Sequence, residues 1–386
     1  MKNVVIVEGK RTAVARANKG ALRDTRPDTF ASLLLKNMLK RIEFNPQDIG
    51  DMIVGCAMPE GSQGLNIART ISMMASLPES IPSFTLNRYC SSGLQAINNI
   101  AQAIEVGNIE LGIAGGVESM SMVPMGGFRF SSSGDLVENN MDFYTSMGIT
   151  AENVASKFNI SRERQDEFAF NSHRKSCNAI KNNLLESEIE TIRVFNYNKQ
   201  EKKFFDFSVD DGPRPDTTVE KLNKLRPCFK VDGTVTAGNS SQMSDGAAFT
   251  LMSSREYAER NNMDILGYFR DFSVTGLSPS IMGIGPVSAI RRLLSRANLT
   301  VDDIGLFEIN EAFASQSLYC IDELKINPDI VNINGGAIAQ GHPLGCTGAR
   351  QSVSILHSMK RLGVKYGVVS MCVGGGMGVA ALFESK

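Results

Sequence analysis

The stretch Asp302-Asp303-Ile304-Gly305-Leu306-Phe307-Glu308-Ile309-Asn310 decides the fold, because an earlier part of the chain resembles it. Gln47-Asp48-Ile49-Gly50-Asp51-Met52-Ile53 has the same acidic turn, the same Ile-Gly step and a similar apolar strand. After each copy come a helix with one apolar face and a short buried strand that ends in glycines, at 94–104 and 111–116 and again at 353–362 and 366–376. The repeat predicts two similar β-α-β-α-β halves that pack against one another.

The residues from 118 to 241 break this pattern. They contain a Met, Gly and Ser-rich start, helical stretches at 151–158 and 162–185, a charged run at 199–203 that is typical of a solvated loop, and Pro213-Arg214-Pro215. Insertions at the carboxyl edge of an α/β sheet commonly cover a ligand. We therefore expect an α/β fold in three parts: an N-terminal half (1–117 and 242–264), an inserted domain (118–241) and a C-terminal half (265–386).

The composition excludes several classes of partner. The 386 residues carry 40 Lys plus Arg against 41 Asp plus Glu, a formal charge of −1, so there is no general positive field for nucleic acid or acidic membranes. No apolar run approaches the ~20 residues that span a bilayer, and the chain passes from Met1 directly into a strand pattern at Val4–Val7. We expect a cytoplasmic protein without membrane insertion.

The cysteine and histidine pattern argues against a disulfide framework or a structural metal site. Seven cysteines are scattered without CxxC pairs, and the chain has only three histidines. We therefore expect reduced thiols, some of them reactive, and no metal.

Cys90 is the first candidate for chemistry. Asn87-Arg88-Tyr89-Cys90-Ser91-Ser92-Gly93 places its thiol at a strand-to-helix junction, where free amide N–H groups and the helix dipole favour the thiolate. The alternative is a small buried apolar residue, which is what most cysteines are.

His342 is the candidate partner of Cys90. It lies in the glycine-rich turn Gly341-His342-Pro343, which a ligand or another chain segment can approach closely, and His is the usual base for Cys. The alternative is a polar group on a surface loop. His173 and His357 lie in helical patterns, and for them we expect a solvent-facing position.

Two further stretches follow buried strands. Cys372 is a second thiol, and the glycines from Gly374 onward offer N–H groups for an oxyanion; a dinucleotide site is a weak alternative because GxGxxG is missing. Asn310 and Glu311 offer an amide and a carboxylate to position water or the histidine.

These stretches, in this order, resemble the thiolase family over essentially the whole chain. The resemblance rests on the Cys90 stretch, Asn310-Glu311-Ala312-Phe313-Ala314, the Gly341-His342-Pro343 turn and Cys372-Val373-Gly374-Gly375-Gly376. It implies two similar five-layered α/β halves and an inserted loop domain that holds coenzyme A.

The resemblance also implies a role for each group. Cys90, activated by His342, takes the acyl group, and Cys372 protonates the departing enolate and then deprotonates the incoming CoA thiol. The enolate oxygen is bound by His342 and a water held by Asn310, and the thioester oxygen faces the N–H groups of Cys90 and Gly374. Coenzyme A enters as a substrate, with Arg214 and Ser241 at positions where thiolases contact it.

Within the family the motifs are similar to those of degradative 3-ketoacyl-CoA thiolases, which cleave 3-ketoacyl-CoA to acetyl-CoA and a shortened acyl-CoA in fatty acid beta-oxidation. Acetoacetyl enzymes typically carry a His where this chain has Ser146, before Met147-Gly148, which suggests a roomier acyl pocket here. Thiolases are usually dimers or tetramers, so we expect a homo-oligomer. Some degradative members join a hydratase/dehydrogenase subunit, and the sequence leaves that partner open.

Three alternatives stay open. An acetoacetyl-CoA thiolase that condenses two acetyl-CoA uses the same residues in reverse. A decarboxylating condensing enzyme of fatty-acid synthesis is disfavoured because such enzymes lack the second thiol. A non-catalytic lipid-binding homologue is disfavoured because all four motifs are intact.

Overall fold

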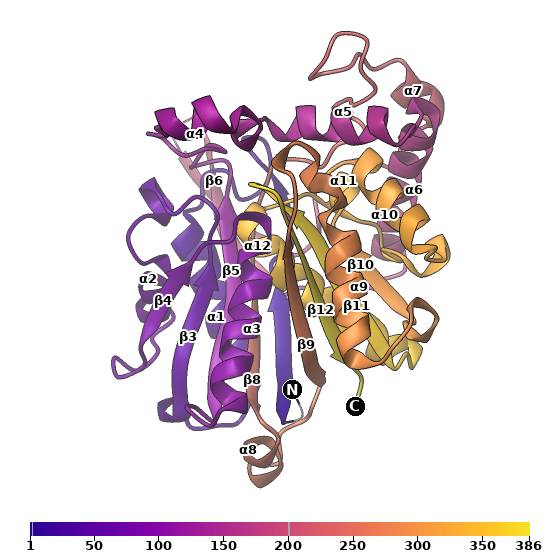
Figure 1. Cartoon of the computed structure of the whole chain (residues 1–386). Helices are drawn as coiled ribbons and strands as arrows, with labels where there is room; N and C mark the ends of the chain where they lie inside the picture. Colours follow the sequence, from indigo (N-terminus) through magenta and orange to yellow (C-terminus); the bar gives the residue numbers. More distant parts are fainter. Residues whose placement is uncertain (2, 200) are drawn as a thin grey trace.

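The computed structural model describes residues 1, 3–199 and 201–386, and a ten-stranded mixed sheet runs through it (Figure 1). The strand order is β4-β3-β5-β8-β1 in the N-terminal half, continued by β9-β12-β11-β10 in the C-terminal half, and β2 (Ala15–Arg16) pairs with β8. The strands are β1 (Val4–Arg11), β3 (Ile49–Gly55), β4 (Ser83–Leu86), β5 (Leu111–Ser119), β8 (Ser244–Ser254), β9 (Gly267–Gly276), β10 (Leu306–Ile309), β11 (Tyr366–Val373) and β12 (Met377–Glu384).

The two halves repeat one topology. Strands β3-β5-β8-β1 correspond in order to β10-β11-β12-β9, with the first pair parallel and the next two pairs antiparallel in both halves. The counterpart of β4 is reduced to a single parallel bridge between Phe307 and Val331. Antiparallel pairing of β1 with β9 joins the halves, with Val5 opposite Tyr268. The repeat predicted from the sequence is thus present in the strand order.

Helices form three layers around the two sheet halves. Helices α1 (Pro27–Leu39) and α2 (Ile67–Met74) cover the outer face of the first half, and α9 (Gly285–Ala297) and α10 (Ala314–Leu324) cover that of the second. Helices α3 (Ser92–Glu105) and α12 (Leu344–Leu362) lie between the halves, and their apolar faces share one core with both. Alternating helix, sheet, helix, sheet and helix layers give a five-layered arrangement of the two halves together.

The central helices approach each other closely because glycines lie where they cross. A Cβ on Gly93 of α3 would lie 2.8 Å from the Ala349 nitrogen, and one on Gly348 of α12 would lie 2.6 Å from the Leu94 nitrogen. Both contacts are with backbone atoms, which cannot move aside as a flexible side chain can. The crossing brings the first turns of the two helices, one after Cys90 and one after His342, to the same place.

The inserted segment does not pack as one separate unit. Its hairpin of β6 (Ile192–Asn198) and β7 (Glu201–Phe207) contributes Ile192, Val194 and Phe207 to the outer core of the first half. Helices α5 (Met147–Lys157) and α6 (Arg162–Lys181) instead pack against α10 and α11 (Ala337–Gln340), on the second half. The remaining helices are α4 (Gly134–Asn139), α7 (Val219–Asn223) and, outside the insertion, α8 (Arg255–Arg260).

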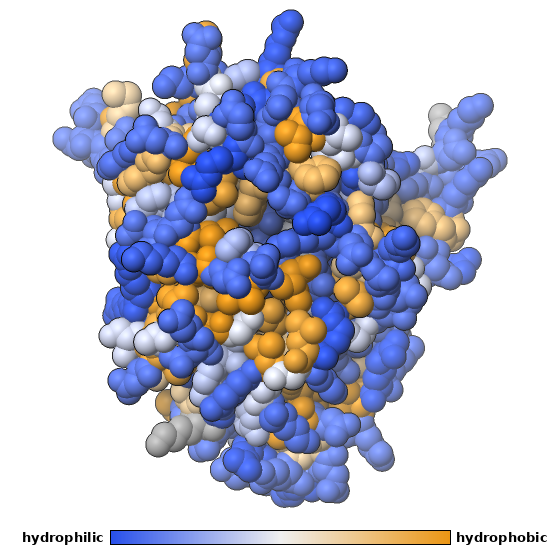
Figure 2. Space-filling model, turned by 90° about the vertical axis from the view of Figure 1, so that its right-hand side faces the viewer, coloured by the Kyte–Doolittle hydropathy of each residue, from blue (hydrophilic) through white to orange (hydrophobic). Residues whose placement is uncertain are grey.

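The expected loop at 199–203 is in part a strand, because β7 begins at Glu201, although its lysines are exposed as expected. Gln200 lies outside the described residues. Figure 2 shows apolar side chains gathered in the middle of one face, with hydrophilic ones around them. None of the helices that the structure describes is long and apolar enough to cross a membrane.

Candidate active site

The turn between β4 and α3 presents Cys90. Asn87 fixes this turn, because its Oδ1 accepts from the Tyr89 N–H at 2.7 Å and its Nδ2 donates to the Ala57 carbonyl at 2.9 Å. The Ser92 hydroxyl accepts from Arg88 N–H and donates to the Tyr89 carbonyl. Tyr89 has a φ of 45°, in the left-handed region that side chains rarely adopt. Such strain persists only where surrounding contacts hold it, as they do here.

Cys90 rests as a neutral thiol. Its sulfur lies near the N–H groups of Gly374 and of Cys90 itself, which favour the thiolate, but burial outweighs them and raises the pKa of the thiol to about 12. The sequence-based expectation of a stabilised thiolate is therefore wrong for the resting protein. Removal of the proton has to accompany the attack on a substrate. Cys90 also packs against a small apolar cluster of Ala57, Met120 and Leu344, the last of which lies two residues after His342.

Cys372 lies at the end of β11, 1% exposed, where sequence analysis expected it. Burial raises the pKa of its thiol well above the usual value, and the neighbouring Cys90 and Cys320 thiols raise it further. Gly375 and Gly376 have φ angles of 78° and 84°, which explains why glycines follow this strand. The turn brings Gly374 N–H back toward the Cys90 sulfur.

The His342 ring is held at both nitrogens. Nε2 lies 3.3 Å from Asn310 Nδ2, and Nδ1 lies 2.6 Å from the Thr347 hydroxyl. Gly341, with a φ of 105°, makes the preceding turn, and the His342 N–H donates to the Gln242 carbonyl. Burial, with a smaller contribution from the Arg350 charge, lowers the pKa of His342 to about 3. The ring is therefore neutral at physiological pH.

Glu311 does not reach the histidine ring, contrary to one reading of the sequence. Its buried carboxylate accepts from the Ser172 hydroxyl at 2.6 Å, from Asn332 Nδ2 at 2.9 Å and from the Ile338 N–H at 3.2 Å. It therefore fixes the segment that leads to His342. Of Asn310 and Glu311, Asn310 is the one that contacts the ring, through its side-chain amide.

The other two histidines are not solvent-facing, so that expectation is wrong. His173 is buried because α6 packs on α11, and its Nδ1 accepts from the Arg214 N–H at 3.1 Å. Burial lowers the pKa of His173 to about 4. His357 is half-buried on α12, with Nε2 3.0 Å from the Gly9 carbonyl oxygen. Helical periodicity did not reveal that both faces of these helices are covered.

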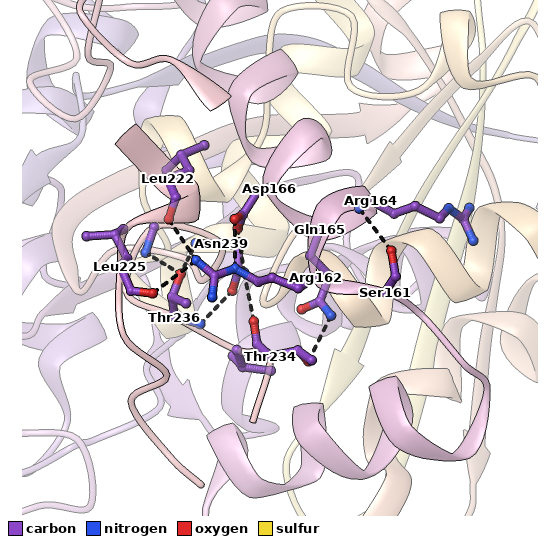
Figure 3. Close-up of polar contacts among 12 residues, drawn as sticks. Ser161, Arg162, Arg164, Gln165, Asp166, Leu222, Leu225, Thr234, Thr236 and Asn239 are labelled. Atoms are coloured by element: carbon purple, nitrogen blue, oxygen red, sulfur yellow. Dashed lines mark hydrogen bonds and ion pairs between the residues drawn. The ribbon is translucent and has the colours of Figure 1, made fainter. Parts of the chain in front are cut away.

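The two residues expected to contact CoA come from the inserted segment. Ser241 is half-buried and its N–H donates to the Ala312 carbonyl, which puts it beside the Asn310 loop. The preceding residues are fixed by α6, because Asp166 accepts from Arg162 Nε at 2.7 Å and from Asn239 Nδ2 at 2.9 Å (Figure 3). Arg214 is exposed between its two prolines, with its side chain available to solvent.

Comparison with known proteins identifies the family. Residues 4–256 match the thiolase N-terminal domain and residues 263–385 match the thiolase C-terminal domain. The chain belongs to the thiolase family. A 3-ketoacyl-CoA thiolase of Bacillus subtilis is 50% identical over 100% of both chains, and the peroxisomal 3-ketoacyl-CoA thiolase of Homo sapiens is 47% identical over 99% of this chain and 91% of its own length.

Solved structures agree with this assignment. The dimeric peroxisomal thiolase of Saccharomyces cerevisiae superposes with a TM-score of 0.92 at 43% identity, covering 100% of this thiolase and 98% of that chain. An acetyl-CoA acetyltransferase of Bacillus anthracis gives a TM-score of 0.91 at 38% identity, covering 100% and 99%. The family resemblance and the fold class inferred from the sequence are confirmed. The roles of individual residues stay predictions.

Sequence analysis missed a carboxylate that joins the two halves of this thiolase. Glu118, at the end of β5, is fully buried and accepts from the N–H groups of Ala57 (2.8 Å) and Gly345 (2.8 Å), among others. It ties the loop after β3 to the turn after His342. Gln242 likewise holds the His342 turn, with Nε2 donating to the Ile338 and Ala339 carbonyls. The one available signal was a charged residue at the end of a buried strand.

Proposed function

We propose that this thiolase cleaves 3-ketoacyl-CoA with CoA, giving acetyl-CoA and a shortened acyl-CoA, as in fatty acid beta-oxidation. The observation that carries the proposal is the meeting of two thiols from the two halves. Cys90 lies near enough to Cys372 to raise the pKa of its thiol, and Gly374 N–H faces the Cys90 sulfur. One thiol can hold an acyl group while the other handles a proton.

In the first half-reaction, Cys90 Sγ bonds to the keto carbon and its proton passes to Nε2 of His342. The bond between the keto carbon and the α-carbon breaks, and its electron pair forms the enolate of acetyl-CoA. Cys372 then protonates that carbon. A buried thiol suits this task, because burial keeps Cys372 protonated until a carbanion forms beside it.

The enolate oxygen needs donors where its charge develops. We assign this to the protonated Nε2 of His342 and to a water held by Asn310, whose Oδ1 is buried without a hydrogen-bond partner on the protein. The acyl thioester oxygen faces the N–H groups of Cys90 and Gly374. In the second half-reaction the Cys372 thiolate takes the proton of CoA, the CoA sulfur attacks the thioester, and Cys90 leaves and regains its proton from His342.

Apolar side chains lie beside these groups, and we propose that the acyl chain contacts them. Met147 packs with Met282 and Cys372 in one cluster, and Phe143 lies over Gly375. Ser146, next to Met147, stands where acetoacetyl enzymes typically carry a histidine, so we propose that chains longer than acetoacetyl are accepted. A pocket of this kind discriminates by only ~1–3 kcal/mol per methylene.

For CoA we propose Arg214 and Ser241 as contacts. We further propose that residues 118–241 form the inserted domain that holds CoA. The N-terminal half then consists of residues 1–117 and 242–264, and the C-terminal half of residues 265–386. Ser241 supports this because it borders the Asn310 loop, and Arg214 because an exposed guanidinium can bind phosphate or stack on adenine.

We also propose a homodimer or homotetramer. The yeast relative is described as dimeric, and β4 is an edge strand with Phe84 41% exposed, an apolar edge that a second copy can cover. A hydratase/dehydrogenase subunit stays a further proposal. For the compartment we propose the cytoplasm, since the name of the Bacillus subtilis relative carries no organelle.

A second function has one observation in its favour. The structural relative from Bacillus anthracis is named an acetyl-CoA acetyltransferase, so the same scaffold also serves two-carbon chemistry. An enzyme of that kind would turn over acetoacetyl-CoA but would not turn over substrates with longer acyl chains.

The deciding experiment follows CoA-dependent cleavage of acetoacetyl-CoA and of a medium-chain 3-ketoacyl-CoA side by side, through loss of the magnesium–enolate absorbance. Cys90→Ala serves as the blank. We expect the longer substrate to be cleaved at a comparable or higher kcat/KM. Turnover of acetoacetyl-CoA alone would establish the second function, and turnover that survives Cys90→Ala would contradict the mechanism.

A further inference from the structure

The Thr347 hydroxyl makes two contacts that together specify where the His342 ring carries its proton. Thr347 Oγ1 lies 2.6 Å from His342 Nδ1 and donates to the Pro343 carbonyl at 3.0 Å. Both residues are buried: Thr347 has no exposed surface, and His342 is 5% exposed. The hydroxyl is one turn from the carbonyl on α12, a geometry in which Thr commonly bonds back to the main chain.

A hydroxyl has a single proton to donate. If that proton goes to Pro343, the oxygen can only accept from the ring, and Nδ1 must carry the hydrogen. The other side of the ring agrees, because the group that faces Nε2 is the Asn310 NH₂, a donor that requires a lone pair on Nε2. Two contacts on opposite sides of the ring thus select one tautomer.

The tautomer matters because the ring is neutral. Burial and the Arg350 guanidinium on α12 lower the pKa of His342, and Arg350 is itself fixed by a 2.6 Å bond to Gln340 Oε1. The titratable groups on the facing segments include the Cys90 and Cys372 thiols, which burial keeps neutral, and the Glu118 carboxyl, whose pKa burial raises. A neutral ring can accept a proton at only one nitrogen, and its tautomer decides which one.

We propose that Thr347 is a positioning residue that holds His342 as the Nδ1–H tautomer, so that the lone pair that can take the proton of Cys90 is on Nε2, the nitrogen that faces Asn310. This inference rests on the proposed role of His342 as the base. When the S–H bond of Cys90 breaks, its proton goes to Nε2, and the imidazolium then donates from Nδ1 to Thr347 and from Nε2 to the enolate oxygen. Thr347 accepts throughout and touches no substrate.

The test compares Thr347→Val, which keeps the shape and removes the hydroxyl, with Thr347→Ser, which keeps the hydroxyl. The first readout is the rate at which iodoacetamide alkylates Cys90 between pH 6 and 9. We expect Thr347→Val to slow alkylation and kcat by 10- to 1000-fold with KM changed less than threefold, and Thr347→Ser to stay within about threefold of the natural protein.

The second readout is independent of activity. In protein labelled with ¹⁵N-histidine, only three histidines contribute, and His342→Ala identifies the signals of His342. We expect its Nδ1 to carry the proton in the natural protein and in Thr347→Ser. In Thr347→Val only the Asn310 contact still favours Nδ1–H, so we expect the Nε2–H tautomer to become populated there. An Nε2–H tautomer in the natural protein, or alkylation by Thr347→Val at the natural rate, would overturn the inference.

The same experiments separate this inference from the proposed function. If His342→Ala leaves Cys90 alkylation unchanged, the assignment of His342 as the base is wrong. If His342→Ala abolishes alkylation of Cys90 while Thr347→Val leaves it at the natural rate, the assignment of His342 as the base is supported and only the proposed role of Thr347 is refuted.

Discussion

The protonation of the two central thiols is set mainly by burial. Cys90 and Cys372 both have raised pKa values, and Cys90 disfavours ionisation of Cys372. Two neutral thiols side by side are suited to successive ionisation, in which one becomes a thioester before the other gives up its proton. The roles are then distinguished by position: Cys90 faces the N–H of Gly374, whereas Cys372 is the more deeply buried of the two.

Replacement of Cys372 should separate the two roles. In Cys372→Ala the enolate has no acid, so we expect kcat for cleavage to fall by about 10² to 10⁴, the usual contribution of general acid–base catalysis. Alkylation of Cys90 by iodoacetamide should stay within about threefold, since His342 is intact. Cys320→Ala, which removes another buried thiol that bonds to the Gly283 carbonyl, is the matched control. Cleavage within tenfold of the natural rate would exclude Cys372 as the acid.

The candidate site was predictable where local chemistry marks a residue. Cys90 follows a strand and precedes a helix, and His342 lies in a turn of glycines, so each is recognisable from its own neighbours. Glu118 was not predictable, because its function is to accept from Gly345, 227 residues away. The burial that raises the pKa of Cys90 is likewise a property of the packed chain. A sequence pattern suggests the helix dipole but not the desolvation that opposes it.

At the scale of elements, the crossing of α3 and α12 sets the distance between the two catalytic turns. The repeat in the sequence predicted both helices, but the predicted order alone did not show that they cross at a glycine from each. The sequence also did not predict that the counterpart of β4 is reduced to one bridge at Val331. A segment this short has no periodic pattern of apolar residues from which a strand could be predicted.

A methyl group at the crossing should separate the helices. In Gly93→Ala the new Cβ meets the Gly345 carbonyl oxygen and the Ala349 nitrogen, both at 2.8 Å, so we expect a loss of about 1–3 kcal/mol in the free energy of unfolding and a fall of at least tenfold in kcat. Gly134→Ala, whose Cβ meets nothing within 4 Å, should change neither. Thermal unfolding and the cleavage assay check both variants. Equal behaviour of the two would show that the crossing tolerates a wider spacing.

At the scale of the whole molecule, a set of buried charges links the N-terminal half to the insertion. Arg11 on β1 binds Glu188 at 2.7 Å and Asp210 with two bonds, and both carboxylates come from the inserted segment. If either partner of such an ion pair is removed, the other is left as an unpaired charge in the protein interior, which is strongly destabilising. The insertion is therefore fixed to the sheet by ion pairs in the interior, a contact that charge counting along the sequence could not locate.

Glu308, which lies on β10 and is buried in the same region, makes the free energy of unfolding depend on pH. Burial, opposed by the Arg350 charge, raises the pKa of Glu308 to about 8, so the folded protein keeps a proton that the unfolded chain loses above about pH 4.5. The folded state then binds more protons than the unfolded one between these values, and this group's stabilising contribution is lost as the pH rises through that range.

Glu308→Gln mimics the protonated carboxyl at every pH and removes this dependence. The difference in free energy of unfolding, natural protein minus Glu308→Gln, should fall by up to about 1.4 kcal/mol per pH unit from pH 5 to pH 8. Urea unfolding at pH 5, 6.5 and 8 measures it, with Glu186→Gln, an exposed carboxylate, as the control for loss of one negative charge. If Glu308 is instead ionised in the fold because Arg350 compensates its charge, the difference stays constant over this range, and the interior holds a stable ion pair rather than a carboxyl that must stay protonated.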